Sequence, residues 1–118
     1  MASKRNLQVA EIIKRNMGMV FFEEGSYIYN DALVTVTNVK LTPDMGQSNI
    51  YLSVYNTEDK NAVLELVQQH THRLRQQLAH RIKRHVRRIP TVHFYIDETL
   101  DEMYRLNALF DGLKNEEE

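Results

Sequence analysis

The residues best suited to chemistry lie in one stretch, HTHRLRQQLAHRIKRHVRRIP, at positions 70–90. It holds four of the five histidines and no acidic residue. Arginine guanidinium groups bind phosphate oxygens through paired hydrogen bonds, and several on one rigid element can follow a nucleic-acid backbone. The stretch therefore predicts phosphate binding by Arg73, Arg75, Arg81, Lys83, Arg84, Arg87 and Arg88, with Lys4 and Arg5 as further contacts.

The charge is distributed unevenly along the 118 residues, although the net charge is only −1. Residues 1–65 carry six basic and eight acidic groups, residues 66–96 carry seven basic and none acidic, and residues 97–118 carry two basic and eight acidic. A solvated helix face is the plain alternative to a binding site, but such faces usually mix both signs. Phosphates respond to local potential, so this distribution favours a nucleic-acid partner.

The histidines do not have the spacing of a metal site. Two histidines share an ion on a helix at i,i+4 spacing, whereas His70 and His72 are two apart and His80 and His85 are five apart. The chain has no cysteine, and we expect no metal and no other cofactor. A small ribonuclease using His85 or His93 as general base is an alternative. No second catalytic group stands at a defined distance, so we expect a protein that is not an enzyme.

The N-terminal half predicts one helix and a β-hairpin. Apolar residues recur at helical spacing over residues 4–24, and Gly25 is expected to end that helix. The next strand changes parity between Val36 and Val39, which predicts a β-bulge near Thr37 and Asn38. A turn with Gly46 at positive φ leads to a second alternating strand. Side chains of the sheet expected to point away from the core are Tyr51, Tyr55, His93 and Tyr95.

The C-terminal half predicts two helices, a strand and a final helix. Asn56 or Thr57 is the expected N-cap of a helix over residues 58–69, followed by a second helix over residues 72–88. Pro90 excludes helix immediately before it. Residues 91–96 alternate as a third strand, and Thr99 with Glu102 forms a capping box for the last helix. The predicted class is α+β, in the order α-β-β-α-α-β-α, with helices on one face of a three-stranded sheet.

Length and composition place bounds on the whole chain. Hydrophobic residues make up 42% of the sequence, enough for a core. We expect a single RNA-binding domain over residues 1–113 and a short acidic tail over residues 114–118. The absence of cysteine suits a reducing cytosol, and no signal core or membrane-length apolar run appears. The prediction is a soluble, cytoplasmic protein with no membrane partner.

Several segments together resemble the bacterial ribosome-binding factor A family. They are VTVTNVKLTPDMGQSNIYLSV, LRQQLAHRI, RIPTVHFYID and TLDEMYRLNAL, in this order after an N-terminal helix. Arg75 corresponds to a basic position of the family pattern. One departure is evident: the family usually has Ala-x-Gly at the kink between the paired helices, where this chain has His70-Thr71-His72.

The resemblance implies a type II KH-like fold and a non-enzymatic ribosome assembly factor. Such factors bind the small (30S) ribosomal subunit and its 16S rRNA during late maturation and 5′-end processing, and they are linked to cold adaptation. A maturation GTPase is implied as the partner that releases the factor, and the protein is expected to be a monomer. A general KH-type RNA-binding regulator or RNA chaperone is the main alternative, and a helical adaptor for anionic proteins is another.

Overall fold

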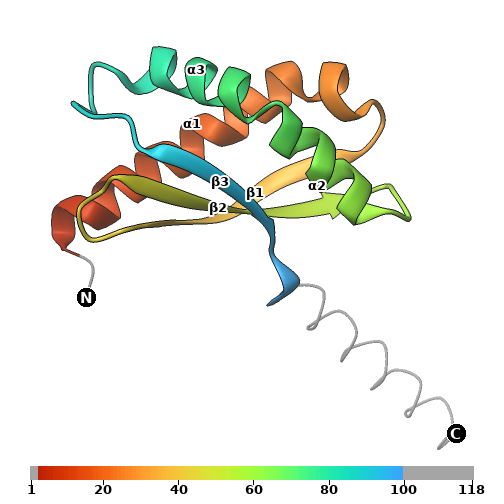
Figure 1. Ribbon diagram of the computed structural model, residues 1–118, viewed down its shortest axis with the longest axis horizontal. Coiled ribbons are helices and arrows are strands. Elements are labelled where there is room, and N and C mark those ends of the chain that lie inside the picture. Colours follow the sequence, from red (N-terminus) through yellow and green to blue (C-terminus); the bar gives the residue numbers. More distant parts are fainter. Residues whose placement is uncertain (1–2, 100–118) are drawn as a thin grey trace, which may run out of the picture.

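The computed structural model describes residues 3–99. Its elements are α1 (Lys4–Tyr29), β1 (Leu33–Leu41), β2 (Gln47–Tyr55), α2 (Lys60–Gln69), α3 (Thr71–Ile82) and β3 (Thr91–Ile96). The strands form one sheet in the order β1-β2-β3, with β1 antiparallel and β3 parallel to β2. All three helices lie on the same face of this sheet (Figure 1). The predicted α+β class and element order are confirmed, except that the predicted last helix lies outside the described residues.

The sheet and helices meet in a single core. Alternation along β2 buries Ile50, Leu52 and Val54, and β3 adds Val92 and Phe94. The helices bury one stripe each, at steps of three or four residues, through Val9, Ile13, Met17, Val20, Phe21, Val63, Val67, Leu74, Leu78 and Ile82. No helix among residues 3–99 has the length and apolar character needed to cross a membrane.

The predicted β-bulge is present. The β1–β2 register shifts between Val36 and Asn38, so Thr37 has no paired residue on β2. This shift returns both Val34 and Val39 to the core, at 7% and 6% exposure. The Thr37 hydroxyl donates a 2.5 Å hydrogen bond to the Asp97 carboxylate just after β3.

Gly25 does not end the first helix, contrary to the prediction. Helix α1 continues for another turn to Tyr29 and stops where Asn30 adopts φ 56°. A Cβ at Gly25 would collide with the hydroxyl of Tyr29. Gly25 is therefore a packing site inside the helix, because the Tyr29 ring folds back over its backbone.

The turn and cap predictions also need correction. Met45, not Gly46, takes the positive φ in the β1–β2 turn, at 58°. The cap of α2 is Asp59, whose carboxylate accepts from the Ala62 amide at 3.0 Å. Asn56 cannot serve, because its φ of 60° is far from the extended conformation of an N-cap. Thr57 instead accepts from the Asp59 amide.

Helix α3 ends six residues before the predicted position 88. Its last residue is Ile82, and the amides of His85 and Val86 fold back onto the Ile82 carbonyl. A helix through residue 88 would stack like charges at i,i+4, for example Lys83 on Arg87, which is destabilising. Val86 still reaches the core, at 6% exposure.

Candidate nucleic-acid interface

Three segments distant in sequence meet at one end of the molecule. They are the start of α1 (residues 4–6), the β1–β2 turn (residues 42–46) and the α3–β3 connection (residues 83–90), at the left in Figure 1. Arg5 donates to the His85 carbonyl at 3.0 Å, and Asn6 donates to the Thr42 carbonyl at 3.1 Å. The amide of Thr91 bonds the Gly46 carbonyl at 3.0 Å. We call these three segments the basic end.

The basic end carries four cations that are free to bind a ligand. Lys83, Arg84, Arg87 and Arg88 are exposed, and their side chains form no hydrogen bond or salt bridge with any of residues 3–99. They lie in an irregular connection rather than on the helix predicted for them. Their positive charges are therefore available to an external anion.

Lys4 and Arg5 add to this surface at an unfavourable place for their own helix. They occupy the first turn of α1, whose dipole is positive there, and no acid accompanies them. Cations at this position destabilise a helix by about 0.3–1 kcal/mol each at low salt. A bound phosphate would relieve that repulsion.

Arg73 and Arg81 are paired within the protein. Arg73 forms a salt bridge with Glu24 at 3.2 Å, and Arg81 contacts Glu23 at 3.4 Å and Asn16 at 3.4 Å. Arg81 also sits in the last turn of α3, where a cation is favoured by the helix dipole. Both residues thus have a structural role in holding α3 against α1.

Arg75 is the most clearly structural of the predicted site residues. Its guanidinium donates to the carbonyls of Ile89 and Pro90, at 2.9 and 3.0 Å, and is partly buried. These bonds hold the end of the α3–β3 connection beside α3. Arg75 therefore supports the backbone of the basic end, and its guanidinium does not project from the surface.

The histidines are separate, and two have local partners. His70 Nδ1 lies 2.8 Å from the Leu66 carbonyl, and His72 Nε2 lies 3.1 Å from the Gln76 amide. Within residues 3–99, no three histidine or carboxylate side chains gather as they would around a metal ion.

Proteins of one family are similar to this chain over most of its length. The family model for ribosome-binding factor A matches residues 5–110. The ribosome-binding factor A of Cytophaga hutchinsonii is 37% identical over 101 residues, which is 86% of this chain and 76% of that protein. The chain belongs to the ribosome-binding factor A family.

Solved structures agree with the fold of this ribosome-binding factor A family member. The crystal structure of the factor from Thermus thermophilus has a TM-score of 0.65 and 21% identity, covering 77% of this chain and 94% of that one. A homology model of the Thermus thermophilus factor, fitted into a cryo-EM map of a 30S–factor complex, has a TM-score of 0.57 and 25% identity. It covers 73% of this chain and 88% of that one.

The kink between α2 and α3 forms without the glycine usual in ribosome-binding factor A proteins. His70 joins the two helices with φ −101° and ψ 15°, a conformation open to non-glycine residues. Its carbonyl accepts from the Leu74 amide at 2.9 Å, and Thr71 donates to the Gln68 carbonyl at 2.7 Å. The kink therefore rests on these bonds rather than on glycine.

The sheet face opposite the helices carries the predicted aromatic side chains. The rings of Tyr51 and Tyr95 are tilted at 32° with centroids 5.7 Å apart, and the Lys40 ammonium lies 5.6 Å from the Tyr51 ring. His93 and Tyr95 are exposed, as predicted for side chains pointing away from the core. Among the described residues this face has one cation near the rings and no cluster of them, so it is a weaker candidate for phosphate binding than the basic end.

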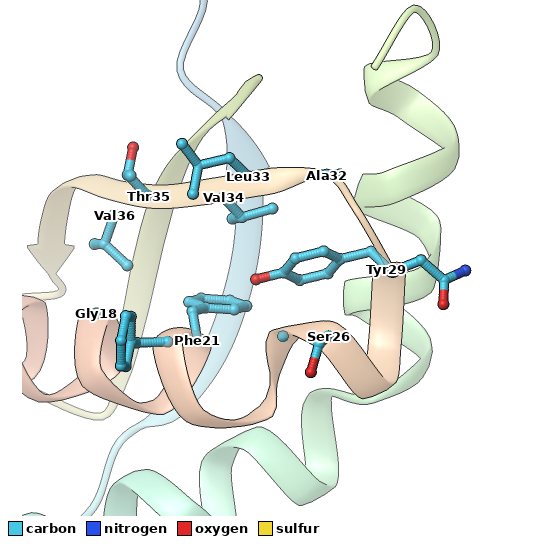
Figure 2. Close-up of a pocket in the computed structure, with 12 residues that line it drawn as sticks. Gly18, Phe21, Ser26, Tyr29, Ala32, Leu33, Val34, Thr35 and Val36 are labelled. Carbon is cyan, nitrogen blue, oxygen red and sulfur yellow. The ribbon is translucent and has the colours of Figure 1, made fainter. Parts of the chain in front are cut away.

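The pocket of about 410 Å³ between α1 and β1 is mostly apolar. Figure 2 shows the Tyr29 ring extending between the helix and the strand, next to Phe21 and opposite Val34. Burial raises the pKa of Tyr29 to about 12, so its hydroxyl stays neutral. With no charged residue in its lining, the pocket does not suit a phosphate.

Sequence reasoning missed the contribution of the β1–β2 turn to the basic end. Asp44 and Met45 are separated by more than 40 residues from Val86, Arg87 and Arg88, the residues of the α3–β3 connection that line the same pocket. Composition grouped the arginines by their position in the sequence, but it could not place a turn beside them.

Proposed function

We propose that this protein binds the small ribosomal subunit through 16S rRNA, with the basic end as the contact surface. The observation that carries the proposal is the group of four exposed cations at one end whose side chains form no hydrogen bond or salt bridge with residues 3–99, with Lys4 and Arg5 beside them. Family membership supports a ribosomal target, and the Thermus thermophilus relative fitted into the map of a 30S complex supports the small subunit.

We further propose that it acts late in subunit maturation, including 5′-end processing, and supports growth in the cold. In this role it is a cytoplasmic monomer that positions rRNA without catalysis, and a GTPase releases it from the finished subunit. Arg73, Arg75 and Arg81 contribute by holding α3 and its connection in place. Lys4, Arg5, Lys83, Arg84, Arg87 and Arg88 contact phosphates.

The test is co-sedimentation of the purified protein with small subunits, large subunits and an unrelated RNA across a salt series. Two double variants have equal loss of charge: Arg84→Gln with Arg87→Gln, and Arg73→Gln with Arg81→Gln. Each lost phosphate contact lowers the magnitude of the slope of log affinity against log salt by about 0.7–0.9. We expect the first variant to lose about 1.4–1.8 in slope and the second to keep the wild-type slope.

The outcomes separate the alternatives. Selective binding to small subunits, together with unprocessed 16S 5′ ends in a strain that depends on the first variant, supports the assembly factor. Equal binding to every RNA supports a general RNA-binding regulator. Equal loss of slope in both double variants would contradict the assignment of contacts to the basic end.

A further inference from the structure

A small pocket lies within the basic end, between α1, the β1–β2 turn and the α3–β3 connection. Its volume is about 180 Å³, below the roughly 300–1,000 Å³ of sites for drug-sized ligands. The size suits one planar ring system. Its lining combines three arginines, one carboxylate and three apolar side chains: Arg5, Arg87, Arg88, Asp44, Val9, Met45 and Val86.

Asp44 is the one acid in this lining, and one of its two carboxylate oxygens already accepts hydrogen bonds within the protein. Its Oδ1 accepts from the Thr42 hydroxyl at 2.6 Å and from the Gly46 amide at 3.0 Å. These two bonds occupy the lone pairs of Oδ1. No other residue among 3–99 donates a hydrogen bond or forms a salt bridge to Oδ2, which remains an acceptor open to a ligand.

The carboxylate and the arginines of the pocket are held apart. The charge of Arg88 acts on Asp44, yet no arginine nitrogen of the described residues forms a salt bridge with it. The hydrogen bonds from Thr42 and Gly46, with a smaller effect of Arg88, lower the pKa of Asp44. The pocket thus offers an ionised acceptor and charged donors at separate places.

A nucleobase that matches this arrangement needs donors on one edge and acceptors on another. Guanine has adjacent N1–H and N2–H donors on its Watson–Crick edge and the acceptors O6 and N7, which arginine reads as a pair. Uracil has a single N–H between two carbonyl oxygens, and these oxygens would be repelled by a carboxylate that approached the N–H. Adenine and cytosine each offer one amino group beside a ring acceptor. Unpaired RNA bases are commonly read on these edges.

We propose that the pocket binds one unpaired guanine of the rRNA, with Asp44 Oδ2 accepting from N1–H and N2–H. An arginine of the pocket donates to O6 and N7, and Val9, Met45 and Val86 pack against the ring. This inference rests on the proposed function, because it adds a base contact to the phosphate contacts of the basic end. It makes the surface selective for a sequence as well as for charge.

One substitution distinguishes a structural role of Asp44 in the turn from a role in binding guanine. Asp44→Asn keeps an oxygen to accept from Thr42 and Gly46, but it replaces the open acceptor with an NH₂ donor. The turn is retained and the match to guanine is lost. Asp31→Asn removes the same charge in the α1–β1 connection and is the matched control.

The experiment measures affinity of the full chain for labelled heptauridylate and for versions with one central guanine, adenine or cytosine. We expect the guanine version to bind about 5- to 100-fold more tightly than heptauridylate, the discrimination typical of a bidentate base contact. Asp44→Asn should abolish this ratio. Asp31→Asn should leave the ratio unchanged, although both variants can bind all the oligonucleotides somewhat better.

Two results would overturn the pocket proposal: equal affinity of the wild-type protein for all four oligonucleotides, or a guanine ratio that survives Asp44→Asn. Thermal unfolding of Asp44→Asn at the wild-type temperature excludes loss of the fold as the cause. Selective small-subunit binding without a guanine ratio removes the pocket proposal alone. A guanine ratio without small-subunit binding supports the pocket and removes the ribosomal assignment.

Discussion

At the scale of single residues, neighbouring arginines of the 70–90 stretch have different roles in the structure. Arg75, Arg73 and Arg81 are bonded within the protein, whereas Arg84 and Arg87 have no partner in the described part of the chain. A guanidinium bonded to partly buried carbonyls is costly to remove, because the carbonyls are left without donors. Stability and binding should therefore respond to different members of the same cluster.

Arg75→Ala should lower the free energy of unfolding by about 2 kcal/mol, since the carbonyls of Ile89 and Pro90 lose a charged donor. Arg75→Lys should recover part of this, because a lysine supplies one donor point where arginine supplies a fork. Arg84→Ala is the control and should stay within about 0.5 kcal/mol of wild type. Urea denaturation measures all three, and equal midpoints for Arg75→Ala and Arg84→Ala would contradict the structural role.

Asp97 makes stability depend on pH. The Thr37 hydroxyl, followed by the Thr99 amide, holds the pKa of Asp97 below its usual value. A lowered folded pKa stabilises the protein above the unfolded value of about 3.9, and that stability is lost as pH falls through the folded pKa.

Thr37→Val should therefore destabilise the protein at pH 7, and the difference from wild type should shrink as the pH falls through the lowered pKa of Asp97. Thr35→Val, an exposed position on the same strand, is the control and should shift stability equally at all pH values. Chemical denaturation from about pH 7 to pH 2 measures both. A constant gap between Thr37→Val and wild type would show that the Tyr51 carbonyl, 3.2 Å from the hydroxyl, is the partner that matters.

At the scale of elements, α1 shows why a glycine is a weak sign of a helix end. Gly18 and Gly25 lie in the same helix, but only Gly25 meets a side chain that would clash with a Cβ. Helix propensity favours alanine over glycine at both positions by about 1 kcal/mol. The two positions differ in their packing, because only a Cβ at Gly25 would clash with a neighbouring side chain.

Gly18→Ala should stabilise the protein by about 0.5–1 kcal/mol, because nothing lies within 4 Å of the new methyl group. Gly25→Ala should destabilise it by about 1–3 kcal/mol, since the buried Tyr29 ring must move. In a Tyr29→Leu background, Gly25→Ala should become stabilising. Thermal unfolding measures these changes, and equal gains from both alanines in the wild-type background would refute the packing role of Gly25.

At the scale of the whole molecule, the fold converts a linear charge pattern into a charged end. Six of the seven basic residues of the 70–90 stretch divide between the α1–α3 contact and the α3–β3 connection, and Arg75 bonds α3 to that connection. Lys4 and Arg5 join the second group because α1 begins where that connection passes, as the Arg5–His85 bond shows. Acidic partners on α1 neutralise Arg73 and Arg81, whereas the cations of the basic end form no salt bridge with residues 3–99.

The sequence by itself determined the class of fold, the β-bulge, the core stripe of α3 and the family. Hydrophobic periodicity and parity carry this information locally, as Val36 and Val39 show for the bulge. Local signals also mislead: Gly25 indicates a stop, and the helical pattern extends through Arg88. These local patterns contain no information about the Tyr29 ring, which packs over the backbone of its own helix at Gly25. They also do not show that Arg75 bonds the Ile89 and Pro90 carbonyls.

Only the tertiary structure decided which cations are free and what stands beside them. Glu23 and Glu24 of α1 pair with arginines of α3, although both strands of the β1–β2 hairpin lie between these helices in the sequence. Asp44 lines a pocket together with Arg87 and Arg88. Such contacts depend on how elements pack, since residues distant in sequence have no common local pattern. The sequence therefore established that a cluster of basic residues is present, and the packing of α1, α3 and the β1–β2 turn decided which of them are exposed together at one end.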